Sequence, residues 1–166
     1  MPAGNNMNNE TVYICRAKDG SDMIPGKTKG LACHLPVGGE NKKADTYEVL
    51  VQNSTTNALE WEDESHGNHG NNAVPGGYTC ACNGETGQIL YIGKTSGIIS
   101  PDGNAQPSTS VIPGKISKCN QKLFYSFGQK EYHVTSYKSL VYRHKTTTTS
   151  PTPAPTPEST TPPLVS

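Results

Sequence analysis

The four residues Ile24-Pro25-Gly26-Lys27 occur a second time in the chain, as Ile112-Pro113-Gly114-Lys115. A short apolar and aromatic stretch precedes each copy, Val12-Tyr13-Ile14-Cys15-Arg16 in the first case and Leu90-Tyr91-Ile92-Gly93-Lys94 in the second. Segments that recur in a fixed order indicate that one structural unit is used twice. The sequence therefore predicts two copies of one repeat.

Two more matching segments follow each copy in the same order. A glycine turn is expected at Val37-Gly38-Gly39-Glu40 and at Phe127-Gly128-Gln129-Lys130. The closing segments, Tyr47–Val51 and Tyr137–Val141, both begin nine residues after the first glycine of the turn. The gap between the first two segments is longer in the second copy, where residues 96–110 have the turn-rich composition of an inserted surface loop.

All of these segments are short, rich in aromatic or β-branched residues and bounded by Gly and Pro, which is typical of β-strands. One repeat has only a single apolar face, so the two copies must pack together to be stable. We expect an all-β fold of two intertwined antiparallel-sheet repeats related by a pseudo-twofold axis. Trp61, which lies between the copies, is expected to fill the shared core near that axis.

The domain organisation follows from the repeat and from a change in composition near the C-terminus. From Thr146 onward the chain has almost no apolar residues and many prolines, so this tail is expected to be disordered, as a spacer or an O-glycosylated stalk. We predict one β domain at 1–145, with repeat one at about 1–52, a linker containing Trp61 at 53–71, repeat two at about 72–145, and a tail at 146–166.

Composition excludes several functions. Lys plus Arg and Asp plus Glu each number 14, which argues against nucleic-acid binding. Acidic residues gather at 40–64 and basic residues at 115–145, as solvated faces or as two charged patches.

No stretch is apolar enough to span a membrane, and Met1–Glu10 shows no signal-peptide core, which favours a cytoplasmic location with an extracellular one as the alternative. Five cysteines, an odd number, are expected to be reduced thiols.

The order of these segments resembles the DM-nine repeat family, whose pattern is a Tyr-Ile strand, then Pro-Gly-Lys, then a glycine-glutamate turn, then Tyr-Glu-Val-Leu. The resemblance implies two intertwined repeats that often form a homodimer, and some members are mannose-binding lectins of innate recognition. In those members an aspartate of the lead-in strand and the lysine of Pro-Gly-Lys hold the sugar. The lysine falls on Lys27 and Lys115, whereas the place of the aspartate is taken by Asn6 and Thr79.

A neutral sugar needs a hydrogen-bond donor and an acceptor side by side. Lysine only donates, and an Asn or Thr side chain accepts more weakly than a carboxylate. The Pro-Gly pair is expected to form a rigid turn that aims Lys27 and Lys115. The resulting hypothesis is a lectin-like protein that binds mannose-type glycans weakly, at two sites per chain.

Other residue groups give no catalytic or cofactor prediction. The segment Glu60–His69 combines carboxylates with histidines but matches no metal-ligand spacing, and Cys80-Ala81-Cys82 lacks the second pair that zinc requires. No catalytic set is recognisable, so we expect a binding protein without cofactor or metal rather than an enzyme. The alternative hypothesis is a protein-interaction or stress- and vesicle-associated protein that uses its charged patches and has no sugar site.

Overall fold

The computed structural model describes residues 1–6, 9–52, 57–80, 87–96 and 111–144, and all regular secondary structure in these ranges is β-strand. The strands are β1 (Pro2–Asn5), β2 (Thr11–Asp19), β3 (Asp22–Lys29), β4 (Ala32–Val37), β5 (Glu40–Ala44), β6 (Glu48–Val49), β7 (Asn57–Ser65), β8 (Pro75–Thr79), β9 (Gln88–Lys94), β10 (Pro113–Ser117), β11 (Lys122–Phe127), β12 (Lys130–Val134) and β13 (Ser136–His144). The predicted all-β class is confirmed. The predicted tail and nearly all of the predicted insertion lie outside the described residues.

The first half of the chain, β1 to β6, and the second half, β8 to β13, pair their strands in the same register. In the first half β2 runs antiparallel to β3 with Ile14 opposite Lys27. In the second half β9 runs antiparallel to β10 with Ile92 opposite Lys115. The two Pro-Gly-Lys segments therefore occupy equivalent places in the fold.

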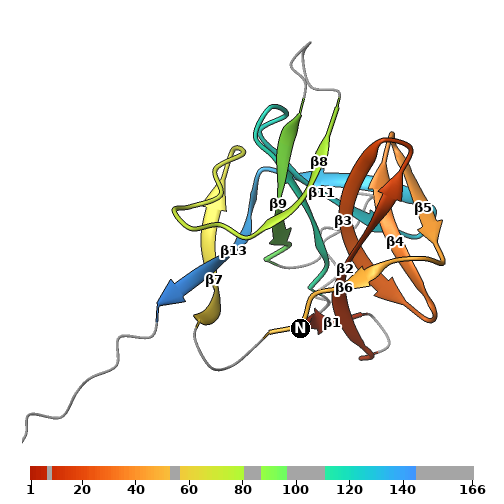
Figure 1. The fold of residues 1–166 in the computed structure, drawn as a ribbon, viewed down its shortest axis with the longest axis horizontal. Coiled ribbons are helices and arrows are strands. Elements are labelled where there is room, and N and C mark those ends of the chain that lie inside the picture. Colours follow the sequence, from red (N-terminus) through yellow and green to blue (C-terminus); the bar gives the residue numbers. More distant parts are fainter. Residues whose placement is uncertain (7–8, 53–56, 81–86, 97–110, 145–166) are drawn as a thin grey trace, which may run out of the picture.

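The two halves are intertwined through their lead-in strands. Strand β8 of the second half pairs with β3 of the first, where Tyr78 lies opposite Met23. In return, the backbone N–H of Val111, just before β10, donates to the carbonyl oxygen of Asn5 in β1 at 3.2 Å. With the β5–β12 pairing, these contacts close a ring of eight antiparallel strands in the order β3-β4-β5-β12-β11-β10-β9-β8 (Figure 1).

The two glycine turns meet where β5 pairs with β12. The backbone N–H of Asn41 donates to the carbonyl oxygen of Gln129, and that of Glu131 donates to the carbonyl oxygen of Gly39, both at 3.1 Å. Each half thus donates one backbone hydrogen bond to the glycine turn of the other half and accepts one in return. This reciprocal contact marks the pseudo-twofold axis predicted from the sequence.

The Pro-Gly-Lys segments are not turns, so that expectation is wrong. Both lie inside strands, β3 and β10. A Cβ atom added to Gly26 would stand 2.1 Å from the carbonyl oxygen of His34, and one added to Gly114 would stand 2.0 Å from that of Phe124. Glycine is required because the neighbouring strand leaves no room for a side chain, and the lysine is aimed by strand pairing rather than by a bend.

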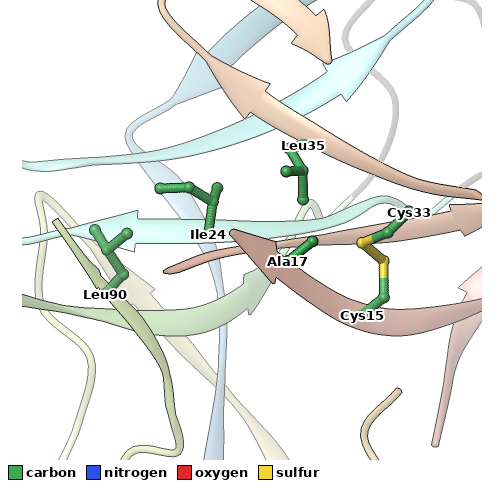
Figure 2. Close-up of a cluster of buried hydrophobic side chains, with 6 residues drawn as sticks. All are labelled: Cys15, Ala17, Ile24, Cys33, Leu35 and Leu90. Carbon is green, nitrogen blue, oxygen red and sulfur yellow. A yellow bond between two sulfur atoms is a disulfide. The ribbon is translucent and has the colours of Figure 1, made fainter. Parts of the chain in front are cut away.

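A disulfide lies in the core of the first half. Cys15 on β2 and Cys33 on β4 are bonded at 1.96 Å, and both side chains are fully buried beside Ala17, Ile24 and Leu35 (Figure 2). Cys119 is disulfide-bonded as well, whereas Cys80 is an exposed free thiol. The expectation of reduced thiols is therefore wrong for Cys15, Cys33 and Cys119.

The second half fills the equivalent place without a disulfide. Gly93 stands where the first half has Cys15, and Leu123 stands where it has Cys33, because both hairpins share one register. A Cβ on Gly93 would come within 2.8 Å of the Leu123 Cδ1 atom. The Leu123 side chain, packed against the bare backbone of Gly93, thus occupies the space that the two bonded sulfur atoms fill in the first half.

The segment expected to be a linker contains β7, which pairs along its length with β13 on the side of the molecule away from β2 to β5 (Figure 1). Acidic β7 residues meet basic β13 residues: Lys138 lies 2.6 Å from Asp63, and Arg143 pairs with Glu60 and Glu62. Part of the charge segregation seen in the sequence is explained by this pairing.

Trp61 on β7 packs against the shared core rather than filling it. The side chain is partly buried and contacts a cluster that combines residues of both halves, among them Ile14, Ile92 and Leu140. The Lys94 ammonium lies 4.3 Å from the centroid of the Trp61 ring.

None of the described residues belongs to a helix that could cross a membrane.

Candidate functional site

Two of the residues expected to bind a sugar, Asn6 and Lys27, line the same hollow. The hollow has a volume of about 210 Å³, which is the space of about seven water molecules. Residues of both halves surround it, because the turn between β11 and β12 reaches the face of β3, β4 and β5. We call this site the Lys27 hollow and define it by Asn6, Lys27, Lys29, His34, Asn41 and Phe127.

Lys27 carries a charge in surroundings that do not neutralise it. Its side chain is 9% exposed, and within the described part of the chain its ammonium forms neither a hydrogen bond nor an ion pair. The Phe127 ring offers a weak cation–π attraction, with its centroid 5.8 Å from Nζ. Burial, with a smaller contribution from the charge of Lys29, lowers the pKa of Lys27 from 10.5 to about 8.

An acceptor stands directly beside this donor. His34 on β4 lies opposite Lys27 on β3, so their side chains are cross-strand neighbours. The Asn41 Nδ2 group donates to the Gly128 carbonyl at 2.7 Å, which turns the Asn41 Oδ1 atom towards His34 Nδ1 at 3.1 Å. Nδ1 therefore carries the proton and Nε2 is left as an acceptor.

The imidazole of His34 stays neutral near pH 7. Burial lowers its pKa, the hydrogen bond with Asn41 partly opposes this, and the charges of Lys27, Lys29 and Lys43 lower it further. A neutral histidine beside a lysine provides an acceptor and a donor next to each other. This is the arrangement that adjacent sugar hydroxyls require.

Asn6 does not act alone in the place of the family's aspartate. Its Oδ1 atom accepts the backbone N–H of Glu10 at 2.9 Å, and its Nδ2 group donates to the Glu10 carboxylate at 2.6 Å. The exposed Glu10 side chain lines two shallower hollows that adjoin the Lys27 hollow and share Lys29 with it. Asn6 thus fixes a carboxylate at the rim of the site.

The equivalent lysine of the second half has its charge neutralised inside the protein. Lys115 Nζ lies 3.2 Å from the Glu131 carboxylate and donates to the Pro36 carbonyl at 2.6 Å. Glu131 stands where the first half has Asn41, and Phe124 stands where it has His34. The second half therefore replaces the acceptor by an apolar ring and supplies its own counter-charge to the lysine.

Thr79, the fourth predicted ligand, binds a carboxylate of the other half. Its hydroxyl donates to Asp22 at 2.8 Å, and the backbone N–H of Cys80 donates to the same carboxylate at 2.8 Å. Burial acts to raise the pKa of Asp22, but these hydrogen bonds and the charge of Lys115 together lower it. Thr79 is thus paired with Asp22 and Lys115 with Glu131, and the charge of Lys115 also acts on Asp22.

Sequence reasoning did not identify His34, Asn41 or Phe127 as parts of the site. A short hairpin turn at Gly30 places His34 opposite Lys27, so recognising that turn in the sequence would have identified His34. Phe127 comes from the other half, and no local pattern indicates that it meets β3. Among the described residues, no three His, Cys, Asp or Glu side chains gather as a metal site would require.

Comparison with protein-family models gives a match over the first part of the chain. The sequence model of the DM9 repeat matches residues 6–98, a range that includes the Lys27 hollow except for the turn of the second half. The chain matches no curated protein. Since the match covers more than half of the 166 residues, the chain belongs to the DM9 repeat family.

Proposed function

We propose that this protein is a carbohydrate-binding, lectin-like recognition protein rather than an enzyme, and that its sugar site is the Lys27 hollow. The observation that carries the proposal is a buried lysine without a protein partner among the described residues, set beside a neutral histidine in an open hollow. Burying an unpaired ammonium costs free energy, so a fold retains one where a ligand completes its hydrogen bonds. The family resemblance implies a mannose-type glycan and a role in innate recognition.

The geometry favours one site per chain instead of the expected two. Lys115 already has the Glu131 carboxylate and the Pro36 carbonyl as partners, and a sugar would have to displace both. Homodimerisation, which the resemblance also implies, would restore bivalency through two Lys27 hollows. Sedimentation at several protein concentrations would reveal a dimer.

A glycan array followed by calorimetric titration tests the proposal. The protein should bind with a stoichiometry near one sugar per chain, and Lys27→Met should weaken binding strongly while the fold is kept. Lys18→Met is the matched control, because Lys18 is exposed on β2 and lies outside the hollow. Equal binding by wild type and Lys27→Met, or no glycan binding at all, would refute the proposal.

The ion pairs between β7 and β13 argue against the alternative function, interaction through charged patches. The acidic residues of β7 and the basic residues of β13 pair with each other, so less charge is left for a partner. Interaction through patches would weaken steeply with ionic strength. Binding of a neutral sugar through its hydroxyls should change little between about 50 and about 300 mM salt.

The disulfide favours the extracellular alternative for location. Disulfides persist in oxidising compartments and are rare in the cytosol. We expect protein purified without reductant from its natural source to contain the Cys15–Cys33 bond, detectable by mass spectrometry of alkylated peptides. Recovery of both cysteines as free thiols would support the cytoplasmic location instead.

A further inference from the structure

We propose that the Lys27 hollow selects an anionic saccharide, a sugar ring that carries a carboxylate, phosphate or sulfate group, and that this group lies against the Lys27 ammonium. The inference rests on the proposed function and names the class of sugar that the site takes. It differs from the neutral mannose that the family resemblance implies.

The Lys27 hollow and its surroundings carry an excess of positive charge. Lys27, His34 and Lys43 lie opposite one another across β3, β4 and β5, and Lys29 completes the group at the end of β3. Within the described residues none of the three lysines forms an ion pair. Three ammonium groups around one neutral imidazole make a site that attracts an anion.

The two halves differ in the residue that stands at the position of Asn41. At the position of Asn41 the second half has Glu131, which pairs with its buried lysine at 3.2 Å. The fold therefore satisfies a lysine at this place with a carboxylate when the protein itself provides one. In the first half the amide of Asn41 leaves Lys27 without that carboxylate, and an anionic ligand supplies it.

Glu10 is the one carboxylate among the residues that line the Lys27 hollow and its two adjoining hollows. Asn6 binds it at the rim, where it is exposed and forms no ion pair with a described lysine. Because Asn6 carries no charge, Glu10 offsets only one of the three ammonium groups. The site keeps a net positive charge, and Lys27, its most deeply buried cation, has no ion-pair partner among the described residues.

The experiment compares sugars that differ only in the anionic group. Mannose is titrated against mannose 6-phosphate, and glucose against glucuronic acid, at pH 7 and constant ionic strength. The anionic member of each pair should bind about tenfold more tightly, because a charge-assisted hydrogen bond is about twice as strong as a neutral one. Inorganic phosphate, titrated alone, should bind more weakly than mannose 6-phosphate.

Two variants sharpen the test. Asn6→Asp adds a carboxylate at the place of the family's aspartate and should weaken the anionic sugars while it strengthens the neutral ones. Lys27→Met should remove the preference, and Lys18→Met, with the same loss of charge outside the hollow, should keep it. Retention of the preference in both Asn6→Asp and Lys27→Met would overturn the proposal.

The failure of this inference differs from the failure of the proposed function. Equal binding of neutral and anionic sugars by wild type would overturn the charge selection and leave a lectin. Binding of inorganic phosphate as tight as that of mannose 6-phosphate would show an anion site without sugar recognition. No binding of any sugar would refute the function itself.

Discussion

Replacing Lys27 by methionine should make the protein more stable while it destroys the site. A pKa that falls from 10.5 to about 8 on folding corresponds to a penalty of about 3 kcal/mol on the charged side chain. Methionine has a similar length and carries no charge, so the penalty disappears. The lost attraction to the Phe127 ring, at 5.8 Å from the centroid, costs about 1 kcal/mol. We therefore expect Lys27→Met to raise the free energy of unfolding by about 2 kcal/mol at pH 7.

The pH dependence separates this account from a simple packing effect. In the unfolded chain Lys27 keeps its proton up to pH 10.5, whereas in the folded protein it loses the proton near pH 8. Between these values the unfolded state binds more protons, so the stability of wild type rises with pH relative to the variant. The advantage of Lys27→Met should be full below pH 7, should fall as pH rises from about 8, and should vanish only above pH 10.5.

Urea unfolding followed by the fluorescence of Trp61, the single tryptophan, measures this difference at each pH. Lys18→Met, which removes an exposed ammonium, should change the stability by less than about 0.5 kcal/mol at every pH. A destabilised Lys27→Met variant, or a difference that does not change between pH 7 and pH 10, would refute the reasoning.

Two predictions test the contacts that hold the site. Glu131→Gln leaves Lys115 without its counter-charge and should lower the free energy of unfolding by about 3 kcal/mol. The double variant with Lys115→Met should regain this stability. An unchanged urea midpoint in Glu131→Gln would show that the pair is not needed. Gly26→Ala should lower the thermal midpoint severely or prevent folding, because its Cβ would stand 2.1 Å from the His34 carbonyl oxygen. Gly20→Ala, where no atom lies within 4 Å and only the positive φ of 62° opposes the side chain, should cost about 1 kcal/mol, and similar losses in the two variants would contradict the steric argument.

The strands and their duplication were predictable because they depend on local patterns. Short segments such as Val12–Arg16 and Leu90–Lys94 are rich in aromatic and β-branched residues, and their recurrence predicted the pseudo-twofold arrangement. The Pro-Gly-Lys turn was predicted wrongly for a physical reason. Gly26 allows β4 to pack closely against β3, but a glycine in a sequence is equally typical of a bend.

The site was only partly predictable because it is assembled from distant segments. Asn6 and Lys27 were identified from the family pattern, and the structure brings both to one hollow. The difference between Lys27 and Lys115 depends on Asn41 and Glu131, whose importance appears only once the two turns are seen to exchange contacts. The Cys15–Cys33 pair was equally hidden, since the odd number of cysteines pointed to thiols.

The titration of the Lys27 amine itself tests the central claim most directly. Lysine side chains labelled with ¹³C and ¹⁵N allow NMR to follow each amine with pH, and Lys27→Met assigns the signal. Free protein should show a pKa of about 8 for Lys27, and saturating mannose 6-phosphate should raise it towards 10.5, because the bound anion favours the charged form. A Lys27 pKa near 10.5 without ligand, unmoved by the sugar, would contradict the account of a buried ammonium that a glycan completes.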